Sequence, residues 1–149
     1  QDSVRNGLAA VTESDWVVIH DGARPCVDTA TLERGLAAAR ETGAAIAAVP
    51  VKDTIKVVDS RNTVVTTPSR DTLWAVQTPQ VFRTRLLIEA HDAVRDDVTD
   101  DASMVERNGG VVKVFMGSYD NIKVTTPEDL AIAEAFLSRK TRPVAGRAR

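Results

Sequence analysis

The segment His20-Asp21-Gly22-Ala23-Arg24-Pro25 brings a carboxylate, a glycine and a guanidinium together directly after an apolar run. That run, Trp16-Val17-Val18-Ile19, is unbroken and β-branched, which predicts a strand buried on both faces of a sheet. Ligands of open α/β sheets bind beyond the carboxyl ends of such strands. There Asp21 could hold a metal ion or orient a hydroxyl, Gly22 would let a ligand approach the backbone, and Arg24 offers a planar fork for phosphate. The plainer interpretation is a surface turn that Asp21 caps and Arg24 pairs with.

Basic side chains elsewhere supply further positive charge for an anionic ligand. Lys123 lies in Asn121-Ile122-Lys123-Val124-Thr125, where the pattern predicts a strand that runs into a capped helix, and helix N-termini favour anions. A solvated lysine at a sheet edge is the commoner case. The eight glycines form neither a G-x-G-x-x-G nor a Walker loop, so the chain has no phosphate cradle of its own. His20 and His91 lack the spacing of metal ligands, so a zinc site is not expected.

Composition restricts the class of protein. The chain has 149 residues, enough for one domain with a core, and its 43% apolar and 27% charged residues are ordinary for a globular protein. A formal net charge of −2 gives no nucleic-acid footprint. The one cysteine, Cys26, excludes an internal disulfide and favours a reducing cytoplasm. No apolar run approaches the roughly 20 residues that span a membrane, so we expect a cytoplasmic protein without membrane or nucleic-acid partners.

Apolar periodicity and capping residues predict alternating helices and strands around these groups. The chain opens on a helix, a second helix begins after Asp28 and stops at Gly43, and residues 45–51 form a buried strand. This βαβ order predicts a parallel sheet. The remaining predicted elements are a short strand at 73–76, a helix around 86–94, a short helix with Asp100 and Asp101 in its first turn, a strand at 111–115, and a helix from Pro127 with Leu130, Ala133 and Leu137 as its buried stripe.

Residues 52–67 break this regularity. Their apolar residues are valines and one isoleucine on either side of the turn cluster Asp59-Ser60-Arg61-Asn62, which predicts a hairpin. The hairpin has too few apolar residues to pack on both sides, and an isolated two-stranded hairpin is marginal in water. It must therefore lean on something else, and the pattern alone favours its own domain over a partner subunit.

Seven motifs, taken in order, resemble the 2-C-methyl-D-erythritol 4-phosphate cytidylyltransferase family. No single motif is decisive, but their order and spacing together are specific, and they cover nearly the whole chain to about Phe136. They are QDSVRNGL at 1–8, HDGARP at 20–25, PVKDTIK at 50–56, the stretch from Arg70 to Leu73-Trp74, QTPQVF at 77–82, TDDAS at 99–103 and NIKVTTPEDL at 121–130.

The resemblance implies a Rossmann-like α/β nucleotidyltransferase with a protruding β-hairpin arm. Such an enzyme transfers CMP from CTP to 2-C-methyl-D-erythritol 4-phosphate in non-mevalonate isoprenoid biosynthesis, releases pyrophosphate and uses Mg²⁺. It works as a homodimer in which the β-arm of each subunit reaches over the other's active site. By this resemblance residues 1–138 are a partial nucleotidyltransferase domain, residues 52–70 are the β-arm, and residues 139–149 are a basic, disordered tail.

The nucleotide side of the implied site falls on four residues. Ser3 corresponds to a residue at the cytosine end of CTP, and Gly22 stands where the family more often has alanine, lining the ribose. Asp21 corresponds to the catalytic residue beside the triphosphate, Mg²⁺ and the substrate hydroxyls, and is the implied metal ligand. Lys123 matches a catalytic residue that contacts both CTP and the attacking phosphate.

The sugar-phosphate side of the implied site draws on both subunits. Arg24, Thr54 and Thr78 match the residues that bind methylerythritol phosphate, with Thr54 supplied across the dimer. Arg70 matches the catalytic partner of Lys123, and together the two position the substrate phosphate for attack. Because nucleophile and electrophile are both anionic, positive charge and fixed geometry suit this chemistry, and no general base is needed.

One departure from the family pattern changes the expectation for this chain. The family begins with a strand and a glycine-rich signature loop that carries an arginine and a lysine, and nothing here matches them. We therefore expect the C-terminal portion of a longer enzyme, inactive or nearly so by itself. Two alternatives remain open from the sequence: a ribitol-phosphate type of cytidylyltransferase, and a non-catalytic dimerisation fragment.

Overall fold

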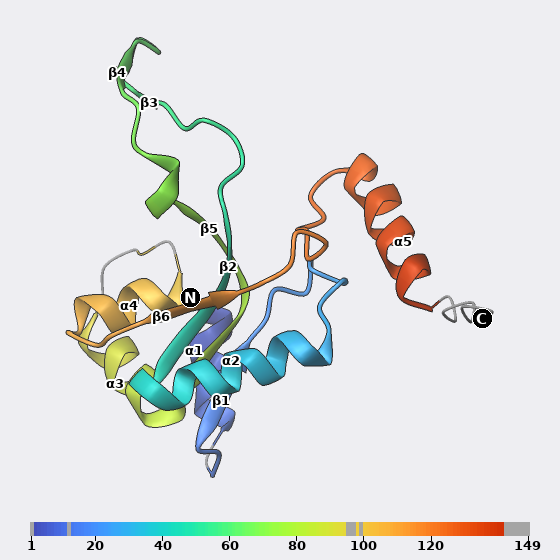
Figure 1. The fold of residues 1–149 in the computed structure, drawn as a ribbon. Helices are drawn as coiled ribbons and strands as arrows, with labels where there is room; N and C mark the ends of the chain where they lie inside the picture. The colour runs from blue at the N-terminus through green and yellow to red at the C-terminus, as the bar shows by residue number, and fades with distance from the viewer. Residues whose placement is uncertain (1, 12, 95–97, 99, 142–149) are drawn as a thin grey trace.

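The computed structural model describes residues 2–11, 13–94, 98 and 100–141, and its elements alternate along the chain (Figure 1). They are, in order, α1 (Asp2–Ala10), β1 (Trp16–Ile19), α2 (Thr29–Thr42), β2 (Ala44–Pro50), β3 (Val57–Val58), β4 (Val64–Thr66), the 3₁₀ turn η1 (Arg70–Thr72), β5 (Trp74–Arg83), α3 (Thr84–Ala93), α4 (Asp101–Arg107), β6 (Lys113–Met116) and α5 (Pro127–Thr141). In this described part of the chain, no helix is both long and apolar enough to cross a membrane.

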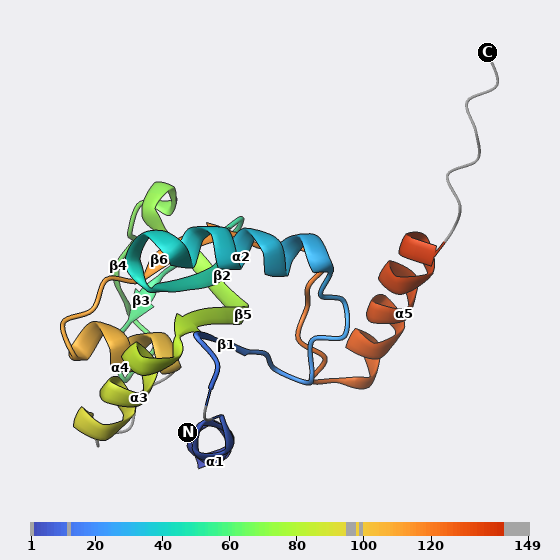
Figure 2. The same ribbon diagram turned by 90° about the horizontal axis from the view of Figure 1, so that it is seen from below.

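A four-stranded mixed sheet, in the order β1-β5-β2-β6, lies at the centre. Helix α2 covers one face, and α3 and α4 cover the other (Figure 2). The two faces have separate cores, one built around Ala45, Val81 and Phe115 beneath α2 and one built around Phe82 and Met104 on the opposite side. The α/β class is therefore confirmed.

The predicted parallel pairing is correct only for β2 and β6. Strand β5 lies between β1 and β2 and runs antiparallel to both. The βαβ order therefore gave the directions of β1 and β2 correctly but missed the strand inserted between them. Such an insertion comes from residues far away in the sequence, which local periodicity cannot report.

Strand β1 is not buried on both faces as predicted. In the described chain it pairs only with β5, and Val18 is 40% exposed. Strand β2 is the element that matches that description, because its residues Ala44 to Val49 are all buried. An apolar run identifies a strand, but its place in the sheet decides how many faces are covered.

Strand β5 is ten residues long, much longer than the short strand predicted at 73–76. It contains the whole of QTPQVF, whose glutamines and proline are poor strand signals. The pairing with β2 shifts register inside this motif, since Ile46 pairs with Gln80 whereas Ala48 pairs with Val76. Two more residues of β5 than of β2 are thus accommodated in a bulge around Thr78 and Pro79, where a proline without an N–H is tolerated.

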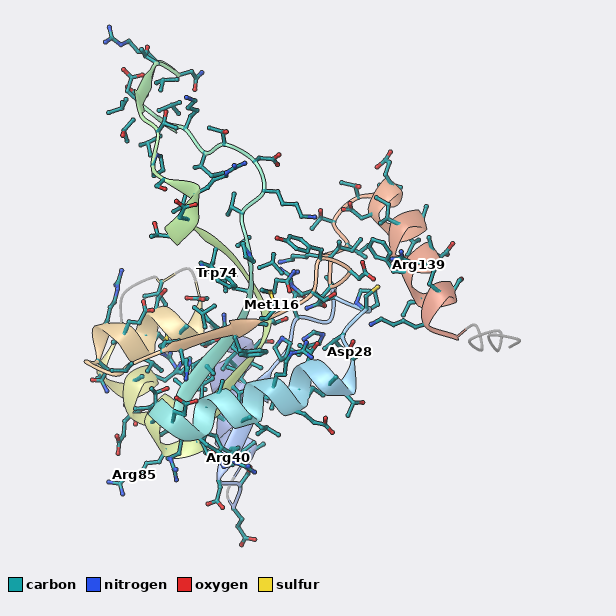
Figure 3. The ribbon with its side chains drawn as sticks, in the orientation of Figure 1. Asp28, Arg40, Trp74, Arg85, Met116 and Arg139 are labelled. Carbon is teal, nitrogen blue, oxygen red and sulfur yellow. The ribbon has the colours of Figure 1, made fainter. Side chains whose placement is uncertain are left out.

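Strands β3 and β4 form the predicted hairpin, which stands away from the rest of the molecule (Figure 1). Its turn is ordered locally: Asp59 accepts hydrogen bonds from the backbone N–H of Arg61 and of Thr63, both at 2.9 Å, and Asn62 adopts a left-handed φ of 60°. The side chains of the hairpin point outward from its two strands (Figure 3). Four of its valines are exposed in this chain: Val57, Val58, Val64 and Val65.

The last helix begins as predicted but packs differently. Asp129 accepts from the N–H of Thr126 and donates its own N–H to the Thr126 hydroxyl, which is a reciprocal cap. Of the predicted buried stripe only Ala133 is buried, while Leu130 is 53% and Leu137 is 38% exposed. Helix α5 continues to Thr141, beyond the predicted boundary at 138, and residues 142–149 of the expected tail lie outside the described residues.

Candidate functional site

A cavity with a volume of about 450 Å³ lies beyond the end of β1. Three segments that are remote in the sequence form its walls. They are the turn after β1 with Asp21 and Arg24, the bulged part of β5, and the first turns of α4, with Lys123 at the rim. The predicted position of a ligand site, at the end of β1, is thus occupied by a hollow of the size that binds small molecules.

Asp21 is fixed in this cavity by three contacts. Its backbone N–H donates to the Thr78 hydroxyl at 2.9 Å, its Oδ1 accepts from the N–H of Ala23 at 2.9 Å, and its Oδ2 lies 2.9 Å from Lys123 Nζ. The hydrogen bond from Lys123, followed by that from Ala23, lowers the pKa of Asp21. The carboxylate is therefore ionised at neutral pH and caps its turn, but its ion-pair partner is Lys123 and not Arg24.

Arg24 is half-buried and points its guanidinium toward the 117–125 segment. Its Nη1 donates to the backbone carbonyl of Asn121 at 2.7 Å, while its buried Nε has no partner among the described residues. Burial lowers the pKa of Arg24, and the nearby charge of Asp21 opposes this change. A guanidinium stays charged in proteins, so a cation with spare donor capacity lines the cavity.

His20, which the sequence left without a role, braces the turn that carries these two residues. Its Nε2 lies 3.0 Å from the Arg24 carbonyl and its Nδ1 lies 3.1 Å from the Thr78 hydroxyl. Because the carbonyl can only accept, Nε2 carries the proton and Nδ1 accepts from Thr78. Thr78 can then accept from the N–H of Asp21, so a single hydroxyl connects β5 to the turn.

The segment 121–125 is not a strand, contrary to the prediction. It is irregular, and its backbone joins the body through Val124, whose N–H donates to the Ala23 carbonyl at 2.8 Å. Within it Asn121 is almost completely buried, and its Nδ2 donates to the Thr78 carbonyl at 2.7 Å. A buried polar residue in an irregular segment indicates that side-chain hydrogen bonds hold the segment in place. The sequence contained one sign of this role for Asn121, which was its position in the NIKVTTPEDL motif.

The opposite wall of the cavity comes from α4 and β5. Asp100 caps α4 by accepting from the N–H and the hydroxyl of Ser103 at 3.0 and 2.6 Å, as the prediction of a helix-start acid required. Its other oxygen accepts from Gln80 Nε2 at 2.9 Å. Gln80, Ser103 and Glu106 line the cavity and were not identified as candidates from the sequence. Gln80 lies in the QTPQVF motif and Ser103 in the TDDAS motif, whereas Glu106 lies in neither.

Four of the predicted site residues do not line this cavity: Ser3, Gly22, Thr54 and Arg70. Ser3 is exposed on α1, Thr54 is exposed at the base of the hairpin, and Arg70 starts η1. The Arg70 guanidinium donates to the Lys52 carbonyl at 2.6 Å, which ties the two sides of the hairpin together. Gly22 is exposed, and an added Cβ would meet no atom within 4 Å, so no part of the described chain requires a glycine there.

Three carboxylates of the described residues line this cavity, and Asp21 is the one that the family resemblance assigns to a divalent cation. Asp21 is partly exposed and presents oxygens, which are the donors that Mg²⁺ prefers, and Mg²⁺ sites that also hold substrate phosphates often use only one or two carboxylates. In the described residues no three His, Cys, Asp or Glu side chains gather as a complete metal cluster. The residues fit a metal that arrives with a phosphate ligand.

Comparison with known proteins agrees with this geometry. The model of the 2-C-methyl-D-erythritol 4-phosphate cytidylyltransferase (IspD) family matches residues 1–139. A protein of that name from Desulforamulus reducens is 50% identical over 144 residues, which are 94% of this chain and 62% of the relative. One from Syntrophotalea carbinolica is 54% identical over 142 residues, which are 92% of this chain and 60% of the relative.

Solved structures give the same result for the fold. A 4-diphosphocytidyl-2C-methyl-D-erythritol synthase from Anaerococcus prevotii superposes with a TM-score of 0.84 at 38% identity, covering 92% of this chain and 65% of that one. The cytidylyltransferase from Thermus thermophilus gives a TM-score of 0.81 at 38% identity, covering 92% and 68%. The chain belongs to the 2-C-methyl-D-erythritol 4-phosphate cytidylyltransferase family, has its Rossmann-like fold, and spans about 62% of the length of the curated relatives it matches.

Proposed function

We propose that this chain carries the sugar-phosphate side of a cytidylyltransferase site, which transfers CMP from CTP to 2-C-methyl-D-erythritol 4-phosphate. In this reaction an oxygen of the sugar phosphate forms a bond to the α-phosphorus of CTP, and the bond from that phosphorus to pyrophosphate breaks. The observation that carries the proposal is the cluster of Asp21, Arg24, Thr78 and Lys123 at one cavity in a chain of this family. The attacking phosphate is already ionised, so no side chain has to remove a proton.

Arg24 and Lys123 supply the positive charge that two anionic reactants need to come together. Arg24 can offer its planar fork to the sugar phosphate, since its buried Nε has no partner in the described part of the protein. Lys123 is held at the rim by Asp21, with 53% of its side chain exposed, so it can reach a phosphate without leaving its place. The Thr78 hydroxyl keeps the Asp21 turn against β5.

Asp21 is the residue that would hold Mg²⁺, together with phosphate oxygens of CTP. When bound, the metal would neutralise negative charge on the triphosphate. The contribution of the protein is to keep the Asp21 carboxylate ionised and aimed at the cavity through Lys123 and the N–H of Ala23. Ser3 and Gly22 remain proposals for the cytosine and ribose ends of CTP.

A homodimer explains why Thr54 and Arg70 lie outside the cavity of their own chain. We propose that the arm formed by residues 52–70 reaches a second subunit and delivers these two side chains there. The four exposed valines of the hairpin support this proposal, because apolar side chains grouped on two short paired strands are typical of an interface. A cytoplasmic location is proposed with it, since the one cysteine is buried and unpaired.

The test is release of pyrophosphate from CTP and 2-C-methyl-D-erythritol 4-phosphate in the presence of Mg²⁺. Turnover with this sugar phosphate, and much less with ribitol 5-phosphate, would support the proposed substrate. Preference for ribitol 5-phosphate would identify the related class of cytidylyltransferase. No turnover and no binding of either sugar phosphate would leave the chain as a dimerisation fragment and contradict the proposal.

A further inference from the structure

Asn121 touches both the strand and the turn that form the cavity. Its side chain is 1% exposed and donates from Nδ2 to the Thr78 carbonyl at 2.7 Å. Its own backbone carbonyl accepts from Arg24 Nη1 at 2.7 Å. One residue thus fixes the distance between Thr78 on β5 and Arg24 after β1, and Lys123 follows two positions later.

The segment around Asn121 depends on such side-chain contacts because it has no regular structure. Residues 117–125 belong to neither a helix nor a strand, so no ladder of hydrogen bonds holds them. Gln77 provides a second brace: its Nε2 donates to the Ser118 carbonyl at 2.9 Å, and its Oε1 accepts from the Ser118 N–H at 3.3 Å. The packing is close, since a Cβ on Gly117 would lie 2.5 Å from Gln77 Oε1.

The bulge in β5 makes the acceptor of this contact available. Around Thr78 the register between β2 and β5 shifts, so residues 77–79 do not pair one by one with β2. The Thr78 carbonyl therefore receives its hydrogen bond from the Asn121 amide instead of from the sheet. Burying a carbonyl without a donor is costly, which makes the amide of Asn121 a specific requirement of this place.

We propose that Asn121 is a positioning residue of the sugar-phosphate site, which sets Arg24 and Lys123 at the separation that a bound phosphate requires. It acts through these two cations and does not touch the substrate itself. This inference rests on the proposed function for its effect on turnover, but its effect on the geometry of the segment does not.

The experiment compares the full chain with two variants at this position. Asn121→Ser removes the amide donor without adding charge, and Asn121→Asp keeps the size but replaces the donor with an acceptor. Asn108→Asp, at an exposed asparagine that ends α4, is the matched control for the added charge. The kinetic measurements are kcat and the separate KM values for 2-C-methyl-D-erythritol 4-phosphate and CTP.

We expect both Asn121 variants to raise the KM for the sugar phosphate about tenfold or more, because a displaced Arg24 would lose a hydrogen bond to the charged phosphate. The KM for CTP should rise less, since Lys123 faces both substrates whereas Arg24 faces only the sugar phosphate. Normal kinetics in Asn121→Ser with a defect only in Asn121→Asp would show that charge is the cause, and would overturn the inference.

Amide hydrogen exchange at Val124 gives a second measurement that needs no activity. The Val124 N–H donates to the Ala23 carbonyl, so it reports whether the segment still docks beside the Arg24 turn. We expect faster exchange at Val124 in both variants and unchanged exchange in the middle of α2. If the wild-type chain neither turns over nor binds a sugar phosphate, the proposed function fails and this exchange alone decides the inference. Unchanged Val124 exchange in the variants would overturn the inference in either case.

Discussion

The cavity and the hairpin arm are built on opposite principles. Around the cavity, Asp21, Thr78 and Asn121 are connected by hydrogen bonds that link β1, β5 and the 117–125 segment. In the arm most contacts stay within the hairpin, such as those of Asp59 with Arg61 and Thr63, and its valines are exposed. Only at its base does Lys52 reach the body in the described residues, with its Nζ 3.6 Å from the centre of the Tyr119 ring. The first region has its geometry fixed within one subunit, whereas the second has a defined shape but its tip packs on no other element of the described chain.

Substitutions in the cavity and in the arm should therefore reduce activity in different ways. Damage to the cavity should disable the subunit that carries it. Damage to the arm should leave its own subunit folded and disable the site of its neighbour. The predictions below test this contrast, beginning with the largest expected effect.

Replacing Lys123 by alanine should lower the rate of CMP transfer by about 10²–10³, the usual cost of losing one aligned charged donor in the transition state. Stability should change little, because the ion pair with Asp21 is partly exposed and such pairs contribute weakly. The measurements are kcat and the thermal unfolding midpoint. Lys113→Ala is the matched control, since Lys113 also pairs with an acid, Glu41, on the α2 side of the sheet. Equal loss of rate in both variants would remove Lys123 from the site.

Arg70→Ala should be inactivating to a similar degree, and mixing it with Lys123→Ala should restore activity. If the arm crosses the dimer, each mixed dimer has one site with both defects and one with neither. Random exchange would then restore about a quarter of wild-type activity, because about half of the dimers are mixed. Subunit exchange is followed independently by mass spectrometry of isotope-labelled protein. Complete exchange without recovered activity would place Arg70 in its own subunit's site or in the fold alone.

Shortening the arm should abolish dimerisation while the body stays folded. Deleting residues 55–67 removes the exposed valines but leaves β2 and β5, which carry the sheet. We expect a monomer in sedimentation velocity, with a thermal unfolding midpoint within a few degrees of wild type. A change of about 1 kcal/mol in the free energy of unfolding shifts the midpoint of a domain of this size by only a few degrees. An unchanged sedimentation coefficient, after correction for mass, would show that another surface forms the dimer.

The smallest effect concerns acid stability. The pKa of Asp21 is lowered in the folded protein, first by Lys123 and then by Ala23, so its contribution is present above the unfolded pKa of about 3.9 and is lost as the pH falls through the folded pKa. The urea midpoint of Asp21→Asn should therefore lie below that of wild type at pH 7, by a difference that shrinks at about pH 3.

The arm supplies a control for this pH effect. Asp59 also has a lowered pKa, mainly because the Thr63 N–H donates to it, but it serves a turn outside the core. Asp59→Asn should leave the urea midpoint unchanged at both pH values. A loss as large as that of Asp21→Asn would mean that arm and body unfold together, and would weaken the contrast between them.

Local elements could be predicted from the sequence wherever their signals were local. The caps at Asp28 and Asp100, the Gly43 stop with its φ of 87°, and the hairpin turn all follow from residues within a few positions of each other. The position of β5 between β1 and β2 could not, because strand order is decided by contacts between distant segments. The buried polar contacts of β5 were missed because Pro79 disfavours the interior of a strand and a glutamine is usually exposed.

The candidate site, too, could be predicted only in part from the sequence. Asp21 and Arg24 could be identified because chemistry-bearing residues directly follow an apolar strand. Their pairing could not, since nothing near Asp21 in the sequence indicates Lys123 or Thr78. Helix α5 was misjudged for a related reason: its stripe has helical spacing, but of that stripe only Ala133 is buried, and Cys26 Sγ lies 3.7 Å from its carbonyl.

The bulge in β5 also determines which changes of chain length this protein can tolerate during evolution. Because β5 has two more residues than β2 across the bulge, Phe82 and Val81 keep their alternation and face separate cores. Deleting one residue from 77–79 would exchange the two faces for part of the strand. Deleting two would preserve the cores but remove the anchor for Asn121. Lineages that lost two residues here could therefore keep the fold and lose the activity.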